Sequence, residues 1–247
     1  DPEVRAAVIT GSGRGFSAGA DIGGGGGEAR EEVWPYGLPE GMSVAERLDT
    51  TRTGTIAGVE RELHLWELGI PVISAVNGWC MGAGSWLALS CHMTIAAEDA
   101  VFSQPEVRMI DSSSFFWIHL AGFKNGLRYA LTGDHIDAQE ALRIGLVNKV
   151  VPPDQLVEEA LSIVERIALV SPETVKINLS VATMGLEMMG LRNALMLEAE
   201  LAAIARSSRR YDFVEHMIEA QKEGGMRAFL QARDGPFRPE PFGPRSA

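Results

Sequence analysis

The sequence Arg14-Gly15-Phe16-Ser17-Ala18-Gly19-Ala20-Asp21-Ile22 and, further along, Asn77-Gly78-Trp79-Cys80-Met81-Gly82-Ala83-Gly84 decide the fold. Each stretch is a turn of small residues that directly follows a β-branched run, at residues 7–10 and 71–76. Small residues let a ligand approach the backbone closely. If both turns open helices and converge, each aims a free backbone N–H at one point, as an oxyanion requires. The pair therefore predicts enolate or acyl chemistry.

Further motifs follow these turns in a recognisable order. They are Ser-Gln-Pro-Glu-Val at 103–107, Leu-Thr-Gly-Asp-His-Ile-Asp-Ala-Gln-Glu-Ala at 131–141 and Gly-Leu-Val-Asn-Lys-Val-Val-Pro at 145–152. In order and spacing the series resembles the crotonase family, which includes enoyl-CoA hydratases and isomerases. The resemblance implies an α/β crotonase fold, a spiral of ββα repeats with a C-terminal helical region that forms trimers, often paired into hexamers.

The same resemblance assigns roles to the two turns. It implies that the N–H groups of Ala20 and Ala83 hold the carbonyl oxygen of a coenzyme A thioester while an α-proton leaves. Coenzyme A is then part of the acyl-CoA substrate, and no separate cofactor is expected. Further substrate contacts are expected at Ala18, Asp21, Ile22, Gly82 and Trp86.

Glu106 is the expected acid/base residue. It lies in Gln-Pro-Glu-Val at 104–107, where the family places a catalytic glutamate. Phe102, Val107 and Met109 surround it in the sequence, and an apolar environment raises the pKa of a carboxylate toward a useful range. An exposed loop glutamate is the alternative.

The second glutamate of the hydratases falls on Trp86 in this chain. An indole has no carboxylate to activate water, and its bulk fills the space that a nucleophilic water needs. The sequence therefore argues against the usual two-carboxylate hydration.

A second departure from the hydratases lies at residues 111–117, which read Asp-Ser-Ser-Ser-Phe-Phe-Trp in place of a Gly- and Pro-rich turn. One interpretation is a serine-rich helix start with Asp111 or Ser112 as N-cap. The other makes Asp111 a replacement carboxylate, with Ser114 near the reacting carbon.

Three functions follow from these residues. The first is a double-bond isomerase of fatty acid metabolism in which Glu106 alone moves the proton. The second is an enoyl-CoA hydratase or C–C hydrolase with Asp111 as second carboxylate. The third is an acyl-CoA binding protein without catalysis. The presence of Glu106 favours an enzyme over a binding protein. Trp86, in the place of a second glutamate, favours the isomerase over the hydratase.

Composition and charge argue against several classes of binding partner. The net charge of −11 opposes nucleic-acid binding, and no apolar run approaches the length of about 18 residues that spans a bilayer. The five histidines lack metal-ligand spacing, so no metal is expected. Cys80 and Cys91 lie in apolar runs, which suits a reducing compartment, and the chain is expected to be soluble and cytoplasmic.

The chain is expected to divide into a spiral core at 1–185, with the family's opening strands missing, and a helical oligomerisation region at 186–247. Five glycines at 23–27 predict a flexible loop or a flap over the acyl pocket. Gly23 replaces a phosphate-binding lysine of many relatives, and Arg233 is a weak substitute. The expected strands are 5–10, 72–76, 93–97, 101–102 and 148–151. The expected helices are 43–66, 84–90, 126–131, 138–144 and 155–168, and Asp154 is the expected N-cap of the last of these. Further helices are expected to start at Ser171 and to cover 212–222 and 226–233.

Overall fold

Two small sheets form the centre of the molecule. The computed structural model describes residues 3–22, 41–208 and 211–243. The first sheet is parallel throughout, in the order β1-β3-β5-β8. Its strands are β1 (Ala7–Thr10), β3 (Val72–Val76), β5 (Met93–Ala97) and β8 (Lys149–Val151).

The second sheet has the order β2-β4-β6-β7, with β7 antiparallel to β6. Its strands are β2 (Gly15–Ser17), β4 (Trp79–Met81), β6 (Val101–Ser103) and β7 (Ile136–Asp137). Strands β1 to β6 alternate between the two sheets, so the chain winds as the expected spiral of ββα repeats. The sequence did not predict β2, β4 or β7, because these strands are only two or three residues long.

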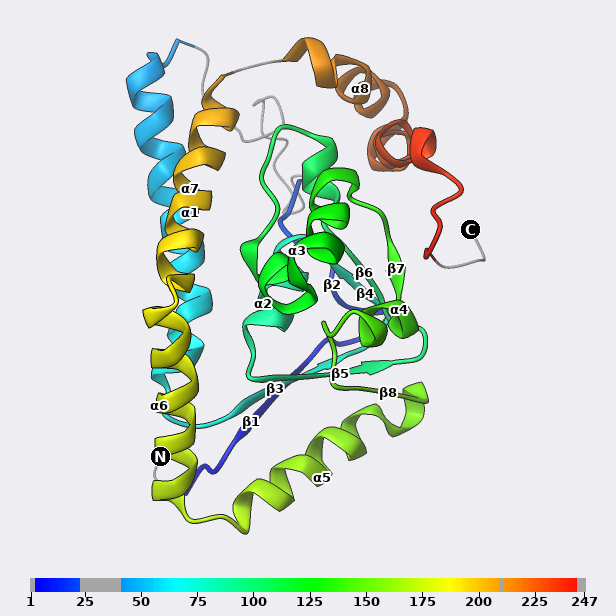
Figure 1. Cartoon of the computed structure of the whole chain (residues 1–247). Helices are drawn as coiled ribbons and strands as arrows, with labels where there is room; N and C mark the ends of the chain where they lie inside the picture. The colour runs from blue at the N-terminus through cyan, green and yellow to red at the C-terminus, as the bar shows by residue number, and fades with distance from the viewer. Residues whose placement is uncertain (1–2, 23–40, 209–210, 244–247) are drawn as a thin grey trace.

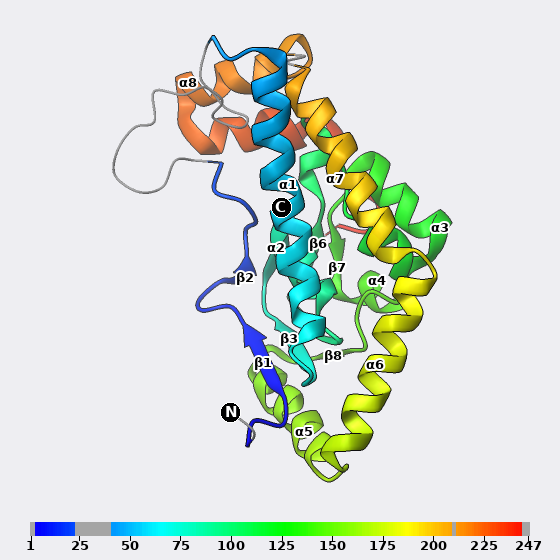
Figure 2. The same cartoon turned by 90° about the vertical axis from the view of Figure 1, so that its left-hand side faces the viewer.

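Helices surround both sheets (Figure 1). α1 and α7 run side by side along one flank, which Figures 1 and 2 show from two directions. Ser43 starts α1 with a complete capping box, in which its side chain and that of Glu46 each accept a backbone N–H of the other residue. The helices of this region are α1 (Val44–Glu67), α2 (Ala83–Ser90), α3 (Phe115–Thr132), α4 (Ala138–Arg143) and α7 (Leu191–Ser207).

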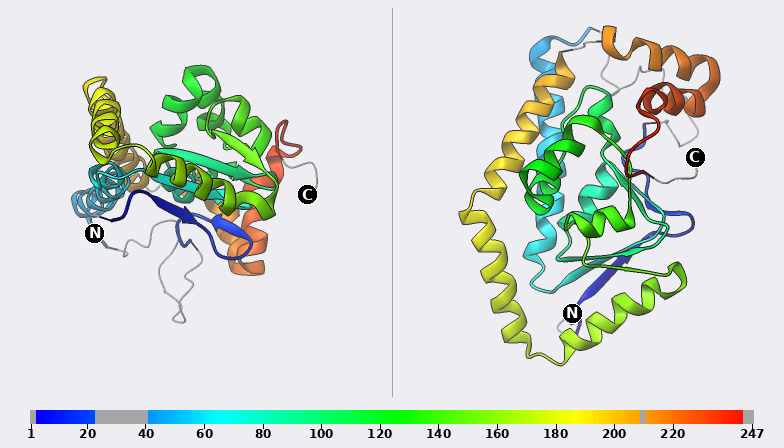
Figure 3. Two further views of the ribbon diagram at one scale, coloured as in Figure 1. Left: turned by 90° about the horizontal axis from the view of Figure 1, so that it is seen from below. Right: turned by 45° about the vertical axis from the view of Figure 1, so that its right-hand side comes forward.

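The C-terminal third is helical, as expected. α5 (Leu156–Ala168) covers the first sheet, and α6 (Pro172–Met188) leads into α7. α8 (Tyr211–Asp234) is broken at Gly225, whose φ of 67° is left-handed. Figure 3 shows α8 beside the second sheet, away from α5. Short 3₁₀ turns are η1 (Pro105–Arg108), η2 (Pro153–Gln155) and η3 (Gly235–Phe237).

Two helix starts differ from the sequence interpretation. Asp154 lies inside η2, and Gln155 is the N-cap of α5, because Pro152 and Pro153 impose a tight turn first. Ser114, not Asp111 or Ser112, caps α3 by accepting the N–H of Phe116. The helix start expected at Ser171 is confirmed, with Ser171 as the N-cap of α6.

The expected boundary at 185/186 falls inside α6, so the division into two regions stays a prediction. The five glycines at 23–27 lie outside the described residues. Within the residues that are described, no helix has both the length and the apolar character to cross a bilayer.

Arg108 fixes the C-terminal segment to the core. Its guanidinium is almost fully buried and pairs with Asp134, Asp234 and Glu240 at 3.2, 3.0 and 2.8 Å. Phe237 stacks on the same guanidinium, 3.9 Å from its ring centroid. One buried cation therefore holds α8 and the segment after η3 against the end of η1.

Candidate active site

The two small-residue turns are in direct contact. A Cβ added at Gly19 would lie 2.7 Å from the carbonyl oxygen of Met81 and 3.5 Å from the nitrogen of Ala83. One added at Gly84 would lie 2.5 Å from the Cβ of Ser17. Both positions therefore require glycine, and this close approach brings Ala20 and Ala83 to one place.

Ala83 is the first residue of α2, so its N–H has no acceptor within the helix. Gly82 precedes it with φ of 51°, a conformation that glycine adopts easily. Among the backbone contacts of the described residues, neither Ala20 nor Ala83 donates a hydrogen bond. Within the described part of the chain, both N–H groups are therefore open to a ligand oxygen.

Two cavities meet at Ala20. The inner cavity, of about 450 Å³, is lined by Ala20, Ala83, Trp86 and Ser112 and by side chains of α1 and α7. The outer cavity, of about 1010 Å³, is lined by residues 18–22 and by β4 and α8. Ala20 lines both cavities, so a ligand that spans them passes the two N–H groups.

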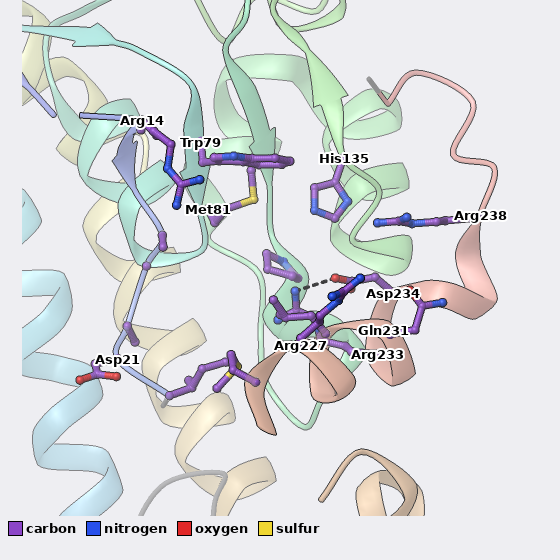
Figure 4. Close-up of a pocket in the computed structure, with 18 residues that line it drawn as sticks. Arg14, Asp21, Trp79, Met81, His135, Arg227, Gln231, Arg233, Asp234 and Arg238 are labelled. Atoms are coloured by element: carbon purple, nitrogen blue, oxygen red, sulfur yellow. Dashed lines mark hydrogen bonds and ion pairs between the residues drawn. The ribbon is translucent and has the colours of Figure 1, made fainter. Parts of the chain in front are cut away.

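Guanidinium groups line the outer cavity (Figure 4). Arg14 approaches from the start of β2, Arg227 from α8 and Arg238 from the segment after η3, and all three are exposed. Arg233, the residue considered as a lysine substitute, is buried and binds Asp234 through two contacts of 2.8 and 2.9 Å. Arg14, Arg227 and Arg238 are therefore better placed than Arg233 to bind phosphate groups.

Glu106 is buried in η1 next to the second turn. A Cβ added at Gly82 would lie 3.0 Å from its Oε2. Burial raises the pKa of Glu106 well above its usual value, and the charge of Asp111 raises it further. The charge of Arg233 and the indole N–H of Trp86 lower the pKa of Glu106. The carboxyl group expected from the sequence is therefore present and is desolvated.

Trp86 faces Glu106 from α2. Its Nε1 is buried and so is Glu106 Oε1, and neither atom has a partner at regular hydrogen-bond geometry among the described residues. Trp86 lies one helical turn after Gly82, the residue beside Glu106 Oε2, and its indole N–H lowers the pKa of Glu106. Trp86 lines the inner cavity and Glu106 lines neither cavity. The indole thus stands beside the carboxyl group, where it was expected to replace a second glutamate.

Asp111 is bound by Arg206 of α7. Arg206 contacts both of its carboxylate oxygens, through Nη2 and, at 2.9 Å, through Nε. The N–H of Ser112 donates to the same carboxylate. Only 4% of the Asp111 side chain is exposed. The residue expected as a replacement carboxylate is therefore held in an ion pair.

The remaining expected contacts separate into two groups. Ala18, Asp21 and Ile22 line the outer cavity. Gly82 and Ser114 line neither cavity; Ser114 is buried and donates its N–H to Gln104 Oε1 at 2.7 Å. No group of three or more metal-ligating side chains occurs in the part of the chain that the structure describes.

Sequence reasoning did not find two glutamates in the inner cavity, Glu62 of α1 and Glu198 of α7. Burial raises the pKa of each to about 8. A signal was present, because each follows a buried apolar residue, Val59 or Leu195, by three positions on the inner face of its helix. A carboxylate in such a stripe is unusual, since Glu is rarely buried without a partner.

Known proteins match this chain over most of its length. The family model described as enoyl-CoA hydratase/isomerase matches residues 1–239. The short-chain-enoyl-CoA hydratase of Clostridium acetobutylicum is 33% identical over 94% of this chain and 80% of its own length. The crotonyl-CoA hydratase of Syntrophomonas wolfei is 34% identical over 96% of this chain and 82% of its own length.

Solved structures agree with these matches. An enoyl-CoA hydratase/isomerase from Xanthobacter autotrophicus Py2 has a TM-score of 0.81 and 29% identity, covering 96% of this chain and 83% of its own. A monofunctional enoyl-CoA isomerase from M. smegmatis has a TM-score of 0.55 and 29% identity, covering 76% and 74%. With its spiral fold and paired turns, this chain belongs to the enoyl-CoA hydratase/isomerase family of the crotonase superfamily.

Proposed function

We propose that this enzyme isomerises the double bond of an enoyl-CoA thioester, with Glu106 as its single proton carrier. The observation that carries the proposal is the pair of Trp86 and Glu106. The residue in the place of a second glutamate is Trp86, whose indole has no carboxylate and takes no proton from water.

In this mechanism the thioester carbonyl oxygen accepts hydrogen bonds from the N–H groups of Ala20 and Ala83. The carboxylate of Glu106 removes a proton from the α-carbon of a 3-enoyl group, and the C–H electron pair moves into a dienolate. Glu106 then returns the proton to the γ-carbon, which leaves a 2-enoyl thioester and the carboxylate. Each oxyanion donor typically contributes about 2.7–4 kcal/mol to the stability of the transition state.

Coenzyme A fits the outer cavity in this proposal. Its phosphates carry negative charge, whereas the whole chain has a net charge of −11, so local cations are needed. Arg14, Arg227 and Arg238 line this cavity and supply them. The pantetheine arm would pass Ala20, where the outer and inner cavities meet.

Hydration is the second candidate, because the two curated relatives described above carry the name hydratase. It needs a second group that activates water. Asp111 was the sequence-based candidate, and its carboxylate is bound on both oxygens by Arg206. This pairing favours the isomerase over an Asp111-dependent hydratase or C–C hydrolase.

We also propose that the chain assembles as a trimer or a hexamer. Large apolar side chains are exposed along α6, α7 and the start of α8, and such a surface favours association. They include Ile177, Val181, Met184, Met188, Leu197, Leu201, Ile204 and Phe213. Sedimentation velocity at micromolar concentration checks this proposal, and a monomer would contradict it.

Deuterium uptake tests the proposed reaction. In heavy water, the wild-type enzyme should convert a 3-enoyl-CoA to the 2-enoyl-CoA and incorporate deuterium, which mass spectrometry detects. Glu106→Gln should slow both events by about 10²–10⁴-fold, because the amide cannot accept the proton. If wild type instead adds water to a 2-enoyl-CoA and does not move the double bond, the hydratase replaces the isomerase. Acyl-CoA binding without any exchange would favour the non-catalytic protein.

A further inference from the structure

The inner cavity contains two carboxyl groups that the proposed proton transfer does not use. Glu62 comes from α1 and Glu198 from α7, and the same cavity is lined by Ala20, Ala83 and Trp86. An acyl group whose carbonyl oxygen lies at Ala20 and Ala83 has this cavity in front of it. The two carboxyl groups are therefore part of the space that receives the acyl chain.

The two groups are neighbours in a largely apolar space. Both line one cavity where α1 packs along α7, and the charge of Glu62 raises the pKa of Glu198. The Oε2 of Glu198 accepts the N–H of Phe115 at 2.6 Å, so a proton on this group belongs on Oε1. Val59, Leu87, Ala199 and Ala202 give the cavity aliphatic surface. Its other polar side chains are Thr55, Arg61, Ser112 and Arg206.

The raised pKa of each group favours its protonated form at neutral pH. Burial is the main cause of the raised pKa of about 8 in each case. Arg61 lowers the pKa of Glu62, and Arg206 lowers that of Glu198, without cancelling the effect of burial. A protonated carboxyl group donates one O–H hydrogen bond. The cavity therefore offers two neutral donors rather than two negative charges.

We infer that Glu62 and Glu198 make the inner cavity selective for acyl groups that carry a neutral hydrogen-bond acceptor, such as a keto oxygen, beyond the thioester. This inference rests on the proposed function, since it takes the inner cavity as the acyl site. A purely aliphatic chain would bury two polar groups without a new partner, which costs binding energy. A cationic acyl group would be repelled by Arg61 and Arg206, which line the same cavity.

Binding of saturated thioesters tests the selectivity without turnover. The probes are 4-, 5- and 6-oxoacyl-CoA compounds, each paired with the compound in which a methyl branch replaces the keto oxygen. Isothermal titration calorimetry at pH 7 should show one oxo compound binding roughly fivefold to tenfold more tightly than its partner. Equal affinities within every pair would overturn the inference.

Variants locate the effect. Glu62→Leu should reduce the preference for the oxo compound or reverse it, because a donor is lost and the apolar surface grows. Glu62→Gln should retain the preference, since its amide N–H groups still donate. Glu60→Leu, an exposed position on the same helix, is the matched control and should keep the wild-type ratio. An unchanged ratio in a folded Glu62→Leu protein would overturn the inference.

The pH dependence provides a second readout. Above pH 8 both carboxyl groups of wild type lose their protons, so the preference for the oxo compound should decline. The double variant Glu62→Gln/Glu198→Gln should keep its preference at high pH. A wild-type ratio that does not change with pH would overturn the inference. If no acyl-CoA binds at all, the proposed function fails as well, whereas equal binding within each pair removes only the selectivity.

Discussion

Arg206 binds both carboxylate oxygens of Asp111, and this contact ties the end of α7 to the segment that precedes α3. The two residues are 95 positions apart in the sequence, so local pattern gave no sign of the pair. The charge of Asp111 also raises the pKa of Glu106 and of Glu198. Asp111 therefore influences the site through its charge while its oxygens are occupied.

Asp111→Asn should reduce stability more than chemistry. The amide cannot form a charged pair with Arg206, and loss of such a contact costs about 1–3 kcal/mol. For a chain of this size each kcal/mol lowers the Tm by about 2–4 °C. Thermal unfolding measures the loss, and deuterium exchange of a 3-enoyl-CoA should continue in the folded protein. An unchanged Tm with exchange as slow as in Glu106→Gln would instead make Asp111 a catalytic group.

Ala83→Pro should abolish catalysis while leaving α2 intact. Ala83 is the first residue of the helix, where proline is tolerated because the N–H has no helical acceptor. The substitution removes one oxyanion donor, and this loss typically lowers kcat by about 10²–10³-fold. Ala83→Gly keeps the N–H and is the control. Circular dichroism should show the same helix content in both variants, and normal turnover in Ala83→Pro would refute the assignment.

Local sequence predicted the parts of the site that depend on backbone conformation. Gly19 and Gly84 mark the turns because no side chain fits there. Glu106 came from the resemblance to the crotonase family, and its catalytic role stays a prediction. Glu62, Glu198 and Arg206 were missed because they enter the cavity only when α7 packs along α1. The same packing brings Arg206 to Asp111 and forms their ion pair. The position of Asp111 in a serine-rich segment gave no indication of this pair.

Trp86→Phe should change the pH dependence of exchange. The indole N–H lowers the pKa of Glu106, so its removal should raise that pKa further. Catalysis needs the ionised carboxylate, and the rate should therefore rise with pH through this pKa in both proteins. In Trp86→Phe the rising part of the profile should lie at higher pH, with slower exchange at neutral pH. Trp66→Phe, which removes an indole N–H bonded to Ser90 outside the site, is the control.

A profile for Trp86→Phe that overlays the wild-type profile would show that the indole has only a space-filling role. A shift to lower pH would contradict the assigned direction. In either case Glu106 would still be tested separately by Glu106→Gln, because that substitution removes the titrating group itself.

Stability should fall as the pH rises from 6.5 to 8. Glu62 and Glu198 have pKa values of about 8 in the folded protein against a usual value of 4.5, so the folded state binds more protons in this range. Their contribution to stability is complete below pH 4.5 and is lost as the pH rises through 8. Burial lowers the pKa of His92 and of His119 below 6.5, and these groups oppose the trend only at lower pH.

The measurement is the Tm at half-unit steps of pH from 6.5 to beyond 8. Wild type should show a steady decline that levels off above pH 8, and Glu62→Gln/Glu198→Gln should show a flatter curve, because an amide does not titrate. Glu60→Gln, on the exposed face of α1, should keep the wild-type slope. Equal slopes in all three proteins would mean that the two carboxyl groups of the inner cavity are already ionised at neutral pH. Both the stability argument and the proton-dependent selectivity would then be wrong.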